Sequence, residues 1–140
     1  NLSGRTITST TMSSYEEGEW TPVLGVGIAT ILTGNYTKVG NLVHFSIYAQ
    51  YINDRSSVDP ITFSLPFSSV PRSNSTKIFT VCRYVTFDPD YYSAYGNILG
   101  SDSEVMLRQE GSGKDTVPLR HDLMSGYNWI QLSGHYYTEE

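Results

Sequence analysis

Apolar and polar residues alternate along much of the chain with the two-residue period of a β-strand. In the longest example, residues 42–52, two sets of side chains would face opposite sides: Val43, Phe45, Ile47, Ala49 and Tyr51 on one, and Leu42, His44, Ser46, Tyr48 and Gln50 on the other. Such alternation is typical of a strand with one buried and one exposed face. We predict that the first set faces a core and that the second set, including His44, faces water or an interface.

Shorter stretches of β-branched and aromatic residues recur at roughly ten-residue spacing, with turn residues between them. They predict strands over 34–39, 61–65, 77–87, 104–109 and 129–137, with an edge segment at 117–119. Gly40-Asn41 would join the first of these to 42–52 in a type II′ hairpin. Since no stretch shows a helical period, the predicted fold is all-β, an antiparallel β-sandwich of jelly-roll-like form.

The chain has 140 residues, which is the size of a single domain. Its first residues are rich in Ser and Thr, so we predict a connector or stalk end over 1–14 and a β-sandwich domain over 15–140. Because the first residue is Asn1 and not Met, we expect a fragment or a processed product of a longer protein.

Composition argues against several classes of protein. The net charge is -5, only 16% of residues are charged, and the basic residues are not clustered, which argues against a nucleic-acid-binding surface. The apolar runs are far shorter than the ~20 residues that span a bilayer, so no membrane insertion is expected. The single cysteine, Cys82, cannot form an internal disulfide, and its apolar surroundings predict a small buried side chain.

Four segments carry distinctive motifs in a fixed order. They are YEEGEWTP at 15–22, YTKVGNLV at 36–43, LPF at 65–67 and SGHYYT at 133–138. These segments resemble the YEEGTWTP, YTKxGxxV, GLPF and SGxYxT motifs of terminal domains in tail-fibre and tailspike proteins of tailed bacteriophages. Glu19 stands where Thr is usual and Ser64 where Gly is usual, and residues 68–127 carry no motif of that family. The resemblance implies a β-sandwich at or near the end of a homotrimeric fibre on the virion, attached to an upstream stalk and acting in host attachment.

A tyrosine-rich segment between two turn signals is the main candidate for ligand contact. It contains Asp88, Asp90, Tyr91, Tyr92, Tyr95 and Asn97. Asp-Pro and Gly-Asn are turn signals, so we expect these tyrosines on a loop or at its borders. Aromatic faces stack on sugar C–H groups while carboxylates and amides bind hydroxyls, which predicts a glycan site. The alternative is that one or two of the tyrosines anchor the loop to the core. A secondary candidate is the set Tyr51, Asn53, Asp54 and Arg55.

The first motif supplies a candidate junction with a neighbouring subunit or the stalk. Its members are Tyr15, Glu16, Glu17 and Trp20. Trp20 either packs against a neighbouring subunit or fills the core of its own chain, and both alternatives remain open. We expect the glutamates to be solvated or paired with basic residues of a neighbour.

We predict no enzymatic activity, no cofactor and no metal. Asp88 and Asp90 are paired carboxylates, as a glycosidase needs, but neighbouring loop acids of this kind are more often turn residues or calcium ligands than an acid and base pair. The three histidines, His44, His121 and His135, lack the spacing of metal ligands, although the fold could still bring them together.

Two functions fit the sequence. The leading one is a non-catalytic attachment domain that binds host surface polysaccharide, or another receptor, through exposed loops. The alternative is a structural trimerisation or folding cap, with recognition or depolymerase activity located upstream in the full protein.

Overall fold

The computed structural model describes residues 14–25, 28–52, 57–70, 76–85, 87–99 and 101–140. These residues form nine strands and one 3-10 turn: β1 (Tyr15–Trp20), β2 (Ile28–Val39), β3 (Leu42–Ile52), β4 (Thr62–Ser64), β5 (Thr76–Val85), β6 (Tyr91–Ile98), β7 (Glu104–Gly111), β8 (Val117–Pro118), η1 (His121–Leu123) and β9 (Met124–Tyr137). Within the described residues, no helix has the length and apolar character needed to cross a membrane.

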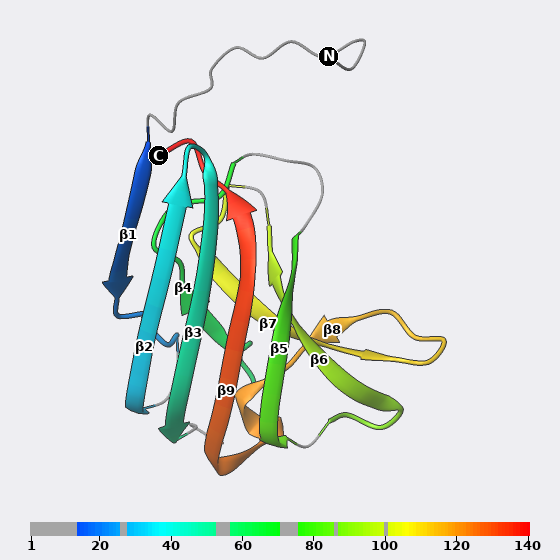
Figure 1. Cartoon of the computed structure of the whole chain (residues 1–140). Coiled ribbons are helices and arrows are strands. Elements are labelled where there is room, and N and C mark those ends of the chain that lie inside the picture. The colour runs from blue at the N-terminus through cyan, green and yellow to red at the C-terminus, as the bar shows by residue number, and fades with distance from the viewer. Residues whose placement is uncertain (1–13, 26–27, 53–56, 71–75, 86, 100) are drawn as a thin grey trace.

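The strands form two layers of antiparallel sheet, which confirms the predicted all-β sandwich (Figure 1). Sheet A has the order β1-β2-β3-β9-β5, and sheet B has the order β5-β6-β7-β4 with β8 beside β7. In both sheets every pairing is antiparallel.

The two sheets are connected along both of their long sides. On one side β5 belongs to both sheets, because residues 76–78 pair with β6 and residues 79–85 pair with β9. On the other side the chain leaving β1 pairs with β4 through a bridge between Leu24 and Phe63. The amide of Ser64 donates to the carbonyl of Val23, and the amide of Val23 donates to the Ser64 hydroxyl. Among the described strands, β1 itself pairs only with β2 and stays at the edge of sheet A.

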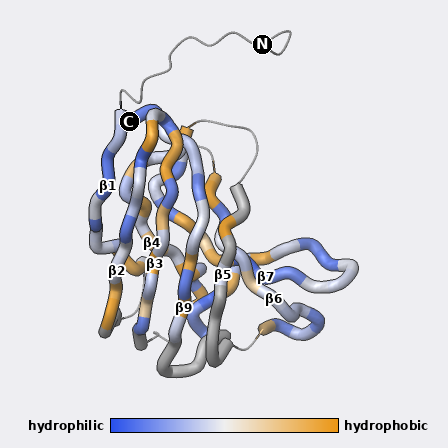
Figure 2. The backbone as a smooth tube through the Cα atoms, viewed as in Figure 1, coloured by the Kyte–Doolittle hydropathy of each residue, from blue (hydrophilic) through white to orange (hydrophobic). Residues whose placement is uncertain are grey.

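The core lies between the inner faces of the sheets. Its buried apolar residues are Val43, Phe45, Ile47, Ala49, Ile61, Phe63, Leu65, Ile78, Ile98, Val105, Leu107, Leu119, Ile130, Leu132 and Tyr136. Figure 2 shows the same apolar–polar alternation along the strands. The predicted inward positions of 42–52 and 61–65 are confirmed wherever their side chains are described, and His44 is exposed as predicted. Each fully buried Leu, Ile or Phe contributes about 1.5–3 kcal/mol relative to an exposed one.

One strand was not predicted from the sequence, and one segment expected on a loop or at its borders is a strand. Residues 15–20 form β1, although their three glutamates and one glycine gave no strand signal; as a sheet edge, the strand tolerates exposed charge. Residues 91–98 form β6, so only Tyr91 and Tyr92 border a loop. Gly96 there is no turn residue. A Cβ on it would lie 2.9 Å from both the Ile78 Cβ and the Val105 Cγ2, so glycine lets β6 approach the core.

The β2–β3 hairpin marks one end of the sandwich. Gly40 has a φ of +59° while Asn41 is not among the described residues of positive φ, which agrees with the predicted type II′ turn. The Gly40 amide donates to the Ser14 carbonyl, and the Thr138 amide donates to the Asn41 carbonyl. The first and last described parts of the chain therefore meet at this end, which we call the hairpin end. Of the predicted connector 1–14, all but Ser14 lies outside the described residues.

Candidate ligand-binding site

The four motif segments meet in space as one aromatic cluster, defined as Trp20, Tyr36, Phe45, Phe67 and Tyr136. Edge-to-face contacts connect its members at centroid distances from 5.1 to 6.4 Å. The ammonium of Lys38, which is 7% exposed, lies 5.8 Å from the Phe67 ring centroid. Such pairs stabilise beyond the area that they bury, so the motifs have a shared structural role.

Tyr136 holds the loop that follows β4. Its hydroxyl donates to the Phe67 carbonyl at 2.8 Å and accepts from the Phe67 amide at 3.2 Å. Burial raises the pKa of Tyr136 above the ordinary value for tyrosine. The phenol therefore stays neutral, and its hydroxyl can act as donor in one of these hydrogen bonds and as acceptor in the other.

Of the predicted junction residues, Trp20 packs against the core of its own chain, one of the two alternatives that the sequence leaves open. Its indole N–H donates to the Ser64 carbonyl at 3.2 Å. Glu17 accepts a hydrogen bond from Tyr15, and Glu16 accepts one from Tyr36. These bonds raise the pKa of both tyrosines. The two carboxylates thus have partners within their own chain.

An exposed apolar row crosses the outer face of sheet A at the hairpin end. Tyr15, Val39, Leu42 and Tyr137 are successive cross-strand partners on β1, β2, β3 and β9. Tyr15 is 53% exposed, Val39 38% and Tyr137 44%. A continuous apolar row of this kind is a feature of protein–protein contact surfaces.

The structure places five of the six main candidate ligand residues in two groups, with Tyr92 in neither, and the first group holds loops together. The Asp88 amide donates to Gln109 Oε1, Gln109 Nε2 donates to Asp88 Oδ2 at 3.0 Å, and Arg120 lies 3.7 Å from Asp88 Oδ1. Arg120 also pairs with Asp122 at 3.0 Å, and this hydrogen bond raises the pKa of Arg120. Because Gln109 is fully buried, this network fixes the loop to the core.

Asp90 and Tyr91 contact the turn between β7 and β8. Asp90 forms an ion pair with Lys114 at 3.1 Å, and the Tyr91 hydroxyl donates to the Asp115 carbonyl. The Lys114 ammonium also lies 5.6 Å from the Tyr91 ring centroid. Tyr91 therefore anchors a loop. Tyr92 lies where the β6–β7 register shifts and is 66% exposed.

The second group, Tyr95 and Asn97, lines a cavity on the outer face of sheet B. This ligand hollow has a volume of about 300 Å³, and its lining residues are Tyr95, Asn97, Leu99, Asp102, Met106, Arg108 and Thr116. Tyr95 is the cross-strand partner of Arg108, and Asn97 that of Met106. The volume is at the small end of the range for ligand pockets, about 300–1,000 Å³.

Two hydrogen bonds hold Arg108 in the wall of the ligand hollow. Its Nη2 donates to the Thr116 carbonyl at 2.8 Å, and its Nε donates to the Thr116 hydroxyl at 3.3 Å. A guanidinium has five N–H donors, so others are left for a ligand. Asp102, on the loop between β6 and β7, supplies a carboxylate in the same cavity.

A second hollow of about 390 Å³ adjoins the first. Its lining residues are Val23, Gly25, Thr62, Ser64, Ser101, Asp102, Ser103 and Glu104. Asp102 borders both hollows, so the two lie next to each other over β6, β7 and β4. In Figure 1 the start of β6 and the end of β7 extend sideways from the two stacked sheets.

Asp102, Arg108 and Thr116 were not predicted from the sequence. Strand alternation places Met106 and Arg108 on the same outward face, which was the available signal; their pairing with Tyr95 and Asn97 depends on the register of β6 and β7. Of the secondary candidates, Tyr51 lies in β3 with its side chain outside the described part, and Asn53, Asp54 and Arg55 lie outside the described residues altogether. Among described residues, no group of three or more His, Cys, Asp or Glu is placed to hold a metal ion.

Comparison with known proteins gives a structural match without a sequence match. No protein-family model and no curated protein matches the chain. The fold is similar to part of a crystal structure of the Dettilon tailspike protein, with a TM-score of 0.69 and 19% sequence identity. The match covers 88% of this chain and 24% of that chain, so the present chain corresponds to about a quarter of the length of that tailspike. The two proteins share this β-sandwich fold.

Proposed function

We propose that this chain is an attachment domain of a phage tail fibre or tailspike and that it binds a host surface saccharide in the ligand hollow. The observation that carries the proposal is the combination in one cavity of an aromatic ring, Tyr95, with the amide of Asn97 and the charges of Asp102 and Arg108. Support for the tail assignment comes from the motif segments and from the fold shared with a tailspike protein.

Each group has a defined role in binding a sugar ring. The apolar faces of Tyr95 and Met106 would contact C–H groups, because stacking on such faces does not require charge. The Asn97 amide and the Asp102 and Arg108 charges would bind hydroxyl groups as acceptors and donors. The neighbouring hollow around Asp102 would take an adjoining sugar, so a polysaccharide fits this surface better than a single ring. The proposed activity is binding without catalysis.

The test is binding of the protein to a panel of immobilised bacterial surface polysaccharides. Tyr95→Ala and Asp102→Asn should each weaken binding at least tenfold, since both line the cavity. Tyr92→Ala is the matched control: Tyr92 is a more exposed tyrosine of the same strand that does not line the hollow, and its loss should change binding less than twofold. Equal effects of Tyr95→Ala and Tyr92→Ala would move the site away from the hollow.

A second candidate function is a structural cap that holds copies of the chain together, and the apolar row Tyr15, Val39, Leu42 and Tyr137 favours it. Each chain carries a net charge of -5, so copies repel one another unless they meet through uncharged surface. This row is uncharged and apolar, and we assign it to contact between copies in a homotrimer.

Sedimentation of the protein tests this assignment. The unaltered protein should form a trimer. When Tyr137 and Val39 are both replaced by Ser, the trimer should be weaker, so that a higher protein concentration is needed to keep it assembled. Tyr92→Ser is the control, because Tyr92 is also an exposed tyrosine but lies outside the row. A monomer at tens of micromolar would contradict the cap function and leave saccharide binding open to test.

A further inference from the structure

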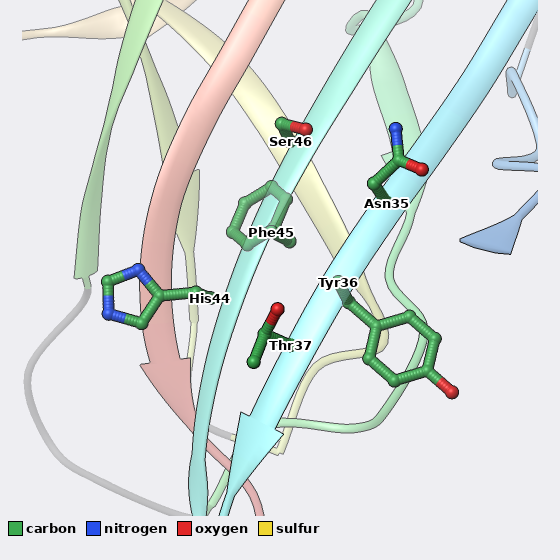
Figure 3. A pocket seen from close by; sticks show the side chains of 6 residues that line it. All are labelled: Asn35, Tyr36, Thr37, His44, Phe45 and Ser46. Carbon is green, nitrogen blue, oxygen red and sulfur yellow. The ribbon is translucent and has the colours of Figure 1, made fainter. Parts of the chain in front are cut away.

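Two of the three histidines, 91 positions apart in sequence, meet on the outer face of sheet A. His44 on β3 and His135 on β9 are direct cross-strand partners. Their ring centroids lie 5.4 Å apart with the ring planes inclined by 38°. Both side chains are exposed. Figure 3 shows the His44 imidazole extending from β3 over the neighbouring strand β9.

This separation fits two imidazoles that share one metal ion. Zn–N bonds of about 2.0–2.1 Å at a tetrahedral angle place the centroids of two coordinating rings roughly 5 Å apart. Exposed side chains rotate within nanoseconds, so small rotations can turn one nitrogen of each ring toward a common point. The strands themselves do not have to move.

The surroundings leave such an ion accessible. The outward-facing described residues of β2, β3 and β9 include no Lys or Arg that would repel a cation: Ile31, Thr33, Asn35, Thr37, Val39, Leu42, His44, Ser46, Tyr48, Gln50, Trp129, Gln131, Ser133, His135 and Tyr137. β5, the other neighbour of β9, carries Lys77 and Arg83, whose side chains lie outside the described part. An open hollow of about 250 Å³ adjoins His44 and is bordered by Asn35, Thr37 and Ser46 (Figure 3).

We propose that His44 and His135 form a binding site for a divalent transition-metal ion of the Zn²⁺ class. Imidazole nitrogen is a preferred ligand of Zn²⁺, Ni²⁺ and Cu²⁺ and a poor ligand of Mg²⁺ and Ca²⁺, which excludes the hard cations. The chain supplies two ligands, and water completes the coordination. The bound ion connects β3 to β9 and so stabilises the folded state. This inference is independent of saccharide binding and of trimer formation.

The experiment is calorimetric titration of the protein with Zn²⁺ at pH 7.5, repeated with Mg²⁺. We expect one Zn²⁺ per chain, no binding of Mg²⁺, and a rise of a few degrees in Tm at saturating Zn²⁺. His44→Asn and His135→Asn should each weaken Zn²⁺ binding at least tenfold and abolish the rise in Tm. Because both positions are exposed, the variants should fold, and circular dichroism verifies it.

Ser46→Ala and Ser133→Ala are the matched controls, because these residues form the adjacent cross-strand pair on the same face. They should keep Zn²⁺ affinity within about threefold. A stoichiometry of one ion per two or three chains, still lost in both histidine variants, would support the site and show that copies share it. Zn²⁺ binding that persists in the double variant His44→Asn/His135→Asn, or no binding at 1 mM Zn²⁺, would overturn the proposal.

Discussion

The aromatic cluster and the ligand hollow differ in what holds them and in how they are encoded. The cluster has two buried rings, Phe45 and Tyr136, with three partly buried rings packed against the core, and it contains a residue from every recognisable motif of the sequence. The side chains that line the hollow are mostly partly exposed, and none of them lies in a motif. The difference shows that distinctive sequence can mark the part of a domain that maintains the fold, while the surface that we propose for ligand binding lies in sequence without a motif.

The largest expected difference between the regions is in stability. Phe45→Ala removes a ring that is 4% exposed and contacts both Trp20 and Tyr136, so we expect a loss of about 3–5 kcal/mol in the free energy of unfolding. Tyr95→Ala, in the hollow, should cost less, about 1–2 kcal/mol, because its side chain is only partly buried. Denaturant unfolding at one protein concentration measures both. Similar losses would contradict the distinction.

A smaller effect is expected from Gly34→Ala. A Cβ at Gly34 would lie 2.7 Å from three ring atoms of Trp20, so the indole must shift and strain its contacts. We expect a loss of about 1–3 kcal/mol, visible also as a change in tryptophan fluorescence. Ser112→Ala, at the exposed tip between β7 and β8, is the control and should stay within about 0.5 kcal/mol. An unchanged stability for Gly34→Ala would show that the cluster is loosely packed.

The cluster should also respond to alkaline pH. Because burial raises the pKa of Tyr136 in the folded state, its stabilising contribution is complete below about pH 10, where an unfolded tyrosine begins to ionise, and is lost as the pH rises toward the folded-state value. Tyr136→Phe should cost about 1–2 kcal/mol at neutral pH, since Phe67 loses its partner. Above about pH 10 the wild type should lose stability more steeply with rising pH than the variant. Parallel pH profiles would contradict the buried, neutral phenol.

The smallest effect is expected at the loops beside the hollow. Lys114→Ala removes an ion pair with Asp90, whose side chain is 72% exposed, so stability should change by less than about 0.5 kcal/mol. Raising the salt concentration should reduce even this difference, because salt screens exposed charges. Chemical denaturation in low and high salt measures it. A loss above about 1 kcal/mol would show that these loops contribute to the fold as the cluster does.

The sequence predicts most strands because alternation is a local property. Residues 42–52 show their buried face directly, and Ile61, Phe63 and Leu65 do the same for β4. Alternation does not reveal β1, whose glutamates suit an edge strand. It does not reveal β6 either, because Gly96 there resembles a turn residue but allows close packing against the core.

The candidate sites depend on strand register, which alternation does not encode. Tyr95 meets Arg108 only through the β6–β7 pairing, and His44 meets His135 only because β9 lies beside β3. Three of the six glycan candidates, Asp88, Asp90 and Tyr91, instead hold loops in place through bonds to residues of other segments. The prediction for Tyr95 and Asn97 remains a prediction, now with a cavity and neighbouring residues to test.

The position of β9 has a consequence for how this domain is made. It comes last in chain order among the described strands, yet it lies between β3 and β5 in the middle of sheet A. A ribosome-bound chain that has emerged only as far as β7 exposes an unpaired edge on each of these two strands. Such edges are templates for pairing with the wrong chain. When several copies are synthesised on one messenger, the final strand thus acts as a late closing step, and delay in its emergence favours misassembly between neighbours.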